Sequence, residues 1–352
     1  MRYSSLHHLE FGEIDISDPF FDTLKEDYDG FENWFAKKVE NNEDAYVQFN
    51  KNGNLQGFLY IKMEESDYVN DVNPSIRANK ILKVGTFKIN AHGTKMGEQF
   101  LKVLFDYAVA TKADVCYVTV FEKHKGLISL ISKYGFIQWG TKGTGDKQEL
   151  VYLKNMRSVS GDLWMDYPLV NYRGHRKYLL SVYPKYHSKL FPESILTNES
   201  RSIIKDISYT NSIRKNYVCA ISGVENLEEG DIIVIYRTSE QGRGAEYTSV
   251  ATTICTVTGI RLQETFSDFE DFYTYTSNLT IFDKEDLLYW YKRGGLKVIS
   301  LVYNFSLKKR IIRHDLIGKI GLSRDNYWGF FELSDNEFIN IVKQGKDIEY
   351  LV

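Results

Sequence analysis

One stretch of the chain, residues 81–139, constrains the fold most, because strand, turn, helix, strand and helix signals follow one another there without a gap. β-branched and aromatic residues half-alternate over 81–89, as in a strand buried on one face. Glu98 then stands in the first turn of a predicted helix, where the helix dipole favours an acid. The apolar positions of that helix are Leu101, Leu104, Phe105 and Ala108. A second strand over 115–121 and a short helix ended by Gly135 complete the unit.

The turn between the first strand and the first helix carries Gly93 and Gly97 and opens directly onto the helix N-terminus. Free backbone amides point outward at such a terminus and can bind a diphosphate. Two glycines at this spacing also occur in turns that only cap a helix. The spacing alone therefore leaves phosphate binding and simple capping both open.

This stretch resembles the GNAT family of acetyl-CoA-dependent N-acetyltransferases. Their pyrophosphate loop reads Arg/Gln-x-x-Gly-x-Gly/Ala, and their last helix reads Asn-x-x-Ala-x-x-Leu-Tyr-x-Lys-x-Gly-Phe. The loop pattern falls on His92, Lys95 and Gly97, and the helix pattern falls on His124, Leu127, Leu130, Ile131, Lys133, Gly135 and Phe136. The resemblance covers about the first 155 residues. It implies acetyl-CoA as co-substrate, held by Phe87, Ile89, His92, Gly93, Thr94, Lys95, Met96 and Gly97.

The same resemblance implies acetyl transfer to an amine, which needs a neutral nucleophile and a stabilised oxyanion. We expect Glu122, at the end of the second strand, as the general base, with His124 as the other candidate for a catalytic role. Ile131 stands where the family often has a proton-donating tyrosine and cannot donate a proton. Residues 64–79 form a polar loop that either folds over the acceptor site or connects strands.

A chain of 352 residues predicts two domains, and we place their boundary near Ser158, giving residues 1–158 and 159–352. Three widely spaced cysteines indicate a reducing compartment without disulfides or a zinc site. No apolar stretch reaches the length of a membrane span, and the N-terminus is too polar for a signal peptide, so we expect a cytoplasmic protein. The net charge of −3 is divided almost evenly between the halves, so any nucleic-acid affinity must come from local patches.

The second half begins with a stretch, residues 167–194, in which basic and aromatic residues interleave. Such a pattern can track a nucleic-acid strand, with Arg173, Arg176 and Lys177 meeting phosphates, or it can be a connector whose aromatics are packed inside. The short strands that follow, broken by glycine-rich turns, suggest a small barrel. An acidic segment over 264–286 lacks ligand-like spacing, so we expect a solvated helix face and no metal.

These strands resemble the PUA-like superfamily of ASCH and EVE domains. The match is carried by Leu227, Gly230, Asp231, Ile235, Tyr236, Arg237 and Val250. The resemblance implies a pocket for RNA or a modified nucleotide, which Arg237, Arg243 and Tyr247 would line.

The sequence thus predicts an α/β (α+β) protein, with a GNAT-like mixed sheet flanked by helices and a PUA-like small β-barrel after it. Three functions stay open. The first is an N-acetyltransferase directed to RNA, for tRNA modification or toxin-like acetylation of aminoacyl-tRNA, with an antitoxin protein as a further partner. The second is a protein or small-amine acetyltransferase with a nucleotide-sensing barrel. The third is a GNAT-like binding protein without catalytic activity.

Overall fold

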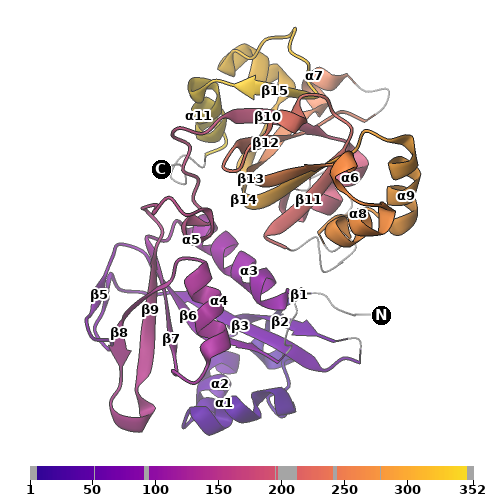
Figure 1. Cartoon of the computed structure of the whole chain (residues 1–352). Helices are drawn as coiled ribbons and strands as arrows, with labels where there is room; N and C mark the ends of the chain where they lie inside the picture. Colours follow the sequence, from indigo (N-terminus) through magenta and orange to yellow (C-terminus); the bar gives the residue numbers. More distant parts are fainter. Residues whose placement is uncertain are drawn as a thin grey trace. The chain divides into compact units, whose positions relative to one another are not determined.

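The computed structural model of the chain describes residues 6–50, 52–90, 95–194, 196, 212–240, 244–277 and 279–346. Contacts within the chain divide it into two compact units (Figure 1). Unit 1 ends at Met156 and unit 2 begins at Arg157, two residues before the boundary expected near Ser158. No helix in the described part of the chain is long and apolar enough to cross a membrane.

Unit 1 is built on a seven-stranded sheet in the order β1-β2-β3-β6-β7-β9-β8. The strands are β1 (Leu6–Glu10), β2 (Asp44–Phe49), β3 (Leu55–Met63), β6 (Ile81–Ile89), β7 (Val115–Val120), β8 (Ile137–Lys142) and β9 (Glu149–Asn155). The helices are α1 (Asp22–Asp27), α2 (Phe31–Glu40), α3 (Met96–Thr111) and α4 (Lys125–Lys133). β6 and β7 are parallel and every other pair is antiparallel, so α3 is the crossover that parallel strands need. The mixed sheet flanked by helices that the sequence predicted is confirmed.

The two faces of this sheet carry different helices. Neighbouring residues of a strand point to opposite faces, and on β6 the Phe87 ring lies 5.9 Å from that of Phe100 in α3. The next residue, Lys88, instead reaches Thr23 of α1. A cluster of aromatic side chains that includes Phe21, Phe35 and Phe58 fixes α1 and α2 to that second face.

A β-bulge interrupts the pairing of β6 with β3. Tyr60 pairs with Thr86 and Ile61 pairs with Val84, so Gly85 between them has no partner. A side-chain carbon at Gly85 would lie 2.5 Å from Cδ1 of Tyr60. Only glycine fits here without displacing the Tyr60 ring.

Residues 64–79, the polar loop of the sequence analysis, connect strands. They contain the short strands β4 (Tyr68–Val69) and β5 (Ile76–Arg77), which pair with each other. Asn73 forms two backbone hydrogen bonds with Thr141 of β8, and Trp139 donates its indole N–H to the carbonyl of Pro74. The loop therefore protects the edge strand β8.

Unit 2 contains a six-stranded sheet in the order β11-β14-β13-β12-β10-β15. The strands are β10 (Lys177–Val182), β11 (Arg214–Cys219), β12 (Ile232–Arg237), β13 (Val250–Leu262), β14 (Lys297–Ile312) and β15 (Phe330–Leu333). Three register shifts bend the β13–β14 pair, and β10 lies parallel to β12. The outermost strands, β11 and β15, do not pair with each other in the described residues. The small β-barrel predicted from the sequence is therefore not shown by the described strands.

The helices of unit 2 are short. They are α5 (Leu163–Asp166), α6 (Pro184–Leu190), α7 (Ala245–Thr248), α8 (Phe269–Thr276), α9 (Lys284–Arg293), α10 (Arg313–Asp315) and α11 (Asp335–Gln344). The acidic segment of the sequence analysis supplies α8 and the start of α9, whose aromatic side chains pack on Val218 and Val298 of the sheet. The three cysteines of the chain, Cys116, Cys219 and Cys255, are buried and free.

Candidate functional site

A cavity of about 730 Å³ lies in unit 1 where β6 and β7 diverge. Its walls come from four segments that are distant in sequence. They are residues 23–34 from α1 to α2, residues 84–89 of β6, residues 118–120 of β7, and residues 123–127 at the start of α4. Because β6 and β7 pair only over Ile81–Val84 and Val115–Val118, the sheet itself opens at this point.

The open part of β6 exposes main-chain hydrogen-bonding groups to the cavity. Residues 86–89 stay paired with β3 on one side, while no strand pairs with them on the β7 side among the described residues. Beyond Val118, β7 continues its pairing with β9 alone. An extended chain that carries amides, as the pantetheine arm of coenzyme A does, fits such an edge as an added strand. The residues present therefore fit the co-substrate that the sequence predicted.

A histidine and a carboxylate meet in the wall of the cavity. Nε2 of His124, the residue before α4, lies 3.2 Å from Oδ2 of Asp27 at the end of α1. Lys123 donates to the other oxygen of the same carboxylate. A carboxylate only accepts hydrogen bonds, so Nε2 carries the proton of this contact, and in the neutral imidazole Nδ1 has the lone pair. The side chain of Asp27 is 9% exposed and that of His124 is 41% exposed, so the carboxylate is fixed while the imidazole reaches solvent.

Two further polar side chains in the cavity wall are held by neighbours. Lys88 donates its ammonium to the carbonyl of Phe20 and to Oγ1 of Thr23, the latter at 2.5 Å. Burial lowers the pKa of Lys88 despite nearby carboxylates. Tyr28 donates its hydroxyl to Oε1 of Glu149 at 3.0 Å, and burial raises the pKa of that phenol, which stays a donor.

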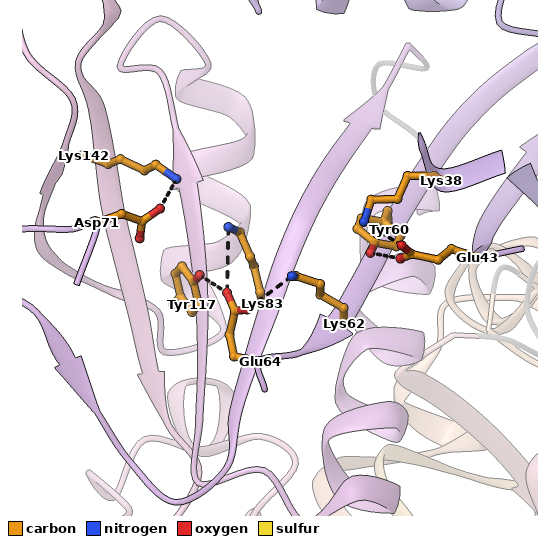
Figure 2. A network of polar contacts seen from close by, with 9 residues as sticks. All are labelled: Lys38, Glu43, Tyr60, Lys62, Glu64, Asp71, Lys83, Tyr117 and Lys142. Atoms are coloured by element: carbon orange, nitrogen blue, oxygen red, sulfur yellow. Dashed lines mark hydrogen bonds and ion pairs between the residues drawn. The ribbon is translucent and has the colours of Figure 1, made fainter. Parts of the chain in front are cut away.

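A polar network lies along the sheet of unit 1 (Figure 2), and none of its residues lines the cavity. Tyr117 donates to Oε1 of Glu64 at 2.5 Å, and Nζ of Lys62 and Nζ of Lys83 lie 3.3 and 3.8 Å from that carboxylate. Burial alone would raise the pKa of Glu64, but the Tyr117 hydrogen bond and the two lysines hold it below the usual value. In the same view Tyr60 donates to Glu43, and Lys142 pairs with Asp71 at 2.7 Å.

The structure places the predicted co-substrate residues differently from one another. Phe87 and Ile89 line the cavity, as the resemblance implied. Lys95 and Met96 lie at the start of α3. Gly97 is buried, and a side-chain carbon there would meet Cδ2 of Leu130 at 2.6 Å, so this glycine lets α3 and α4 approach each other. His92, Gly93 and Thr94 lie outside the described residues.

The structure does not place Glu122 in the cavity wall. Its carboxylate is exposed to solvent and accepts a hydrogen bond from Lys125 at 2.7 Å, and this contact lowers its pKa. The carboxylate that faces the cavity beside His124 is Asp27, which the sequence analysis missed. Ile131, at the tyrosine position of the family pattern, is buried in the core of unit 1. His124 therefore lines the cavity, and Glu122 does not.

Three of the six residues predicted to contact nucleic acid form ion pairs within unit 2. Lys177 is 2% exposed and donates to Oδ1 of Asp335 at 2.6 Å. Arg176 donates to both oxygens of Asp231, at 3.2 and 2.8 Å. Arg237 is 3% exposed, 3.5 Å from Glu240. Of the basic and aromatic stretch, residues 177–182 form the inner strand β10, so packing accounts for much of that pattern.

The other predicted contacts are Arg173, Tyr247 and Arg243. Arg173 is exposed, with its guanidinium 5.2 Å from the centre of the Tyr172 ring. Tyr247 is 64% exposed. Arg243 lies outside the described residues. Within the described residues, no group of three or more His, Cys, Asp or Glu side chains is placed to hold a metal ion.

Comparisons with known proteins give similarity at low identity. No family model matches the chain, and no curated protein matches it. Among solved structures, a GNAT-family acetyltransferase from Streptococcus pneumoniae is 15% identical over 43% of this chain and 97% of that chain (TM-score 0.31). A Streptococcus agalactiae acetyltransferase of that family is 17% identical over 39% of this chain and 79% of that one (TM-score 0.31). A mutant of the ASCH protein of Zymomonas mobilis is 12% identical over 48% of this chain and 95% of that chain (TM-score 0.32). With values this low, the function has to be argued from the site itself.

Proposed function

We propose that unit 1 transfers an acetyl group from acetyl-CoA to the amine of an acceptor bound in its cavity. The observation that carries the proposal is the free main-chain edge of β6 inside a cavity that also holds the His124–Asp27 pair. The edge suits an amide-bearing thioester arm, and the imidazole suits the proton that an attacking amine must lose. Both features lie in one cavity, as a two-substrate reaction requires.

The chain's own residues perform four tasks in this reaction. Main-chain groups of residues 85–89 hold and orient the thioester arm. Asp27 accepts a hydrogen bond from Nε2–H of His124, which leaves Nδ1 to take the proton from the acceptor amine. Lys123 shares the Asp27 carboxylate and keeps it in place. The amine then attacks the thioester carbonyl carbon, the C–S bond breaks, and its electron pair leaves on sulfur.

The test is a calorimetric titration with acetyl-CoA followed by an assay of thiol release with a panel of amines. We expect one binding site per chain, and thiol release that depends on the amine. His124→Ala should bind acetyl-CoA but release thiol roughly 10²-fold more slowly. Absence of acetyl-CoA binding by the folded wild type would overturn the proposal. Binding without thiol release from any amine would favour the third hypothesis, a binding protein without catalytic activity.

We propose RNA as the partner of unit 2. The surface that we propose for it excludes most of the basic residues predicted from the sequence. The exposed Tyr247 ring stacks on His314, with centroids 5.0 Å apart and planes 21° apart. Oε1 of Glu246 lies 3.2 Å from Nδ1 of His314 and 2.8 Å from the guanidinium of Arg324. A stacked aromatic ring beside an exposed guanidinium suits an unpaired base and its phosphate.

Binding of a labelled single-stranded RNA to the full chain tests this surface. Tyr247→Ala should weaken binding by about 1–3 kcal/mol, the usual contribution of base stacking on one ring. Arg176→Lys, which keeps the positive charge beside Asp231, serves as the control and should leave binding unchanged. Equal affinity of wild type and Tyr247→Ala would exclude this surface.

A further inference from the structure

Lys88 is the least exposed of the three lysines that line the cavity among the described residues. Lys123 and Lys125 also line the cavity, but their side chains are 60% and 69% exposed. Lys88 is partly buried, packs 4.8 Å from the centre of the Phe20 ring, and is fixed by its two hydrogen bonds to residues 20 and 23. It also belongs to the part of β6 that diverges from β7.

The two hydrogen bonds leave the amine suited to nucleophilic attack. A neutral primary amine has two N–H groups and one lone pair, and Lys88 has one acceptor for each N–H, the carbonyl of Phe20 and Oγ1 of Thr23. The lone pair is then directed away from both acceptors. A hydrogen-bonded, partly desolvated lysine of this kind is the usual form of a reactive lysine.

The surroundings of Lys88 have opposite effects on the pKa of its amine. Burial disfavours the ammonium, while the carboxylates of Asp22, Asp27, Glu26 and Asp18 favour it. The net result is a pKa below the usual lysine value, because burial outweighs the carboxylates. More of this amine is therefore neutral near pH 8 than of an exposed lysine.

We propose that Lys88 is a self-acetylation site, where a bound acyl-CoA thioester transfers its acetyl group to the chain itself. The inference rests on the proposed binding of acetyl-CoA in this cavity. The Nζ lone pair attacks the thioester carbonyl carbon, a C–N bond forms and the C–S bond breaks. Its electron pair leaves on sulfur, and the proton lost by Nζ neutralises the thiolate. The products are Nε-acetyllysine and free coenzyme A.

Acetylation of Lys88 would inhibit acetyl transfer in the cavity where it occurs. The amide product keeps one N–H, so only one of the two hydrogen bonds to residues 20 and 23 can remain. The acetyl group then fills part of the space between β6 and α1. Transfer to an outside amine would fall as the modification accumulates, and acceptor amines that occupy the cavity would slow it.

The experiment incubates the full chain with acetyl-CoA and no acceptor amine, then locates acetyl groups by peptide mass spectrometry at several times. Lys83 and Lys125 are matched internal controls. The pKa of Lys83 is also lowered by burial, but this lysine lies outside the cavity wall, whereas Lys125 lines the cavity and is exposed. We expect Lys88 to be acetylated at least roughly tenfold faster than either, because bound substrate raises the local concentration of thioester.

Acetyl phosphate, which lacks the pantetheine arm, is the second probe and should favour Lys125 over Lys88. Calorimetry on the same sample separates the possible failures. Acetyl-CoA that binds but leaves Lys88 no faster than Lys83 would overturn self-acetylation and leave the proposed function intact. Acetyl-CoA that does not bind would overturn both. Lys88→Arg should remove the Lys88 signal without moving acetylation to residue 83, and a new signal there would show that the selectivity is not set by the cavity.

Discussion

The Nε2 atom of His124 lies 3.2 Å from Oδ2 of Asp27, although the two residues are 97 positions apart in the chain. The contact joins the end of α1 to the residue before α4, on two sides of the opening between β6 and β7. It fixes the tautomer of the imidazole, since the carboxylate can only accept. The position of α1 on the sheet therefore decides how the histidine is presented to a substrate.

Removing either member of this pair should slow acetyl transfer by different amounts. His124→Ala deletes the proton acceptor, and we expect kcat to fall roughly 10²-fold or more. Asp27→Asn keeps the imidazole but not the fixed tautomer, so its loss should be smaller. Glu122→Gln changes an exposed carboxylate at the end of the same loop and should leave kcat unchanged in the thiol-release assay. A loss of kcat in Glu122→Gln equal to that in His124→Ala would contradict the assignment of His124 as the proton acceptor.

Filling the bulge at Gly85 should destabilise unit 1. A methyl group there would lie 2.5 Å from Cδ1 of Tyr60, so the ring or the strand must move. We expect Gly85→Ala to lower the free energy of unfolding by about 1–3 kcal/mol, measured by urea denaturation. Gly126→Ala is the matched control, because nothing lies within 4 Å of its added carbon and alanine favours the helix. A neutral Gly85→Ala would show that the bulge does not require glycine.

The network around Glu64 should make unit 1 acid-sensitive. A carboxyl group whose pKa is lowered on folding stabilises the folded state above its unfolded pKa, near the usual 4.5. That contribution is lost as the pH falls from there through the lower folded pKa. Tyr117→Phe removes the hydrogen bond to Glu64 and should cost about 1.5–3 kcal/mol at neutral pH, with a smaller further loss on acidification than in wild type. Urea midpoints of wild type and Tyr117→Phe at pH 7 and pH 3 measure the loss at neutral pH and the further loss in acid. An identical pH dependence of the two proteins would contradict the role of the Glu64 network in acid sensitivity.

Removing the carboxylate partner of Lys177 should destabilise unit 2. The Lys177 side chain is 2% exposed and its Nζ lies 2.6 Å from Asp335, so Asp335→Asn leaves the lysine without its carboxylate partner. We expect a loss of about 1–3 kcal/mol in unfolding free energy. The control is Asp315→Asn, which breaks an i,i+4 pair with the exposed Lys319 and should cost only about 0.5 kcal/mol. Similar losses in both variants would show that burial of Lys177 does not matter.

Local signals in the sequence predicted the local structure well. Asp18 caps the turn that starts at Pro19, and Ser334 with Glu337 forms a capping box, and both caps follow residue patterns visible in the sequence. The strand over 81–89 and the helix after it also lie where the periodicity put them. These features depend on neighbours a few residues apart, which is the range that periodicity and capping rules cover.

The misses involve partners distant in sequence. Asp27 gave no signal, because its role appears only when α1 lies against the start of α4. Lys177 was interpreted as a phosphate contact, because a basic residue among tyrosines looks like a surface, yet its partner Asp335 is 158 positions away. Gly85 did carry a signal, since an isolated glycine within a strand pattern indicates a bulge.

The free edge of β6 has consequences for the dynamics of this strand and for how far the sequences of homologous chains can diverge. No strand of the described chain protects the amides of residues 85–89 that point toward β7. Their hydrogens should therefore exchange quickly with solvent, and the exchange should slow sharply when a substrate arm pairs with them. The bound substrate would then act as an additional strand and make this half of β6 rigid. Because the edge consists of main-chain groups, homologous chains can replace nearly every side chain along the strand and still recognise the same ligand.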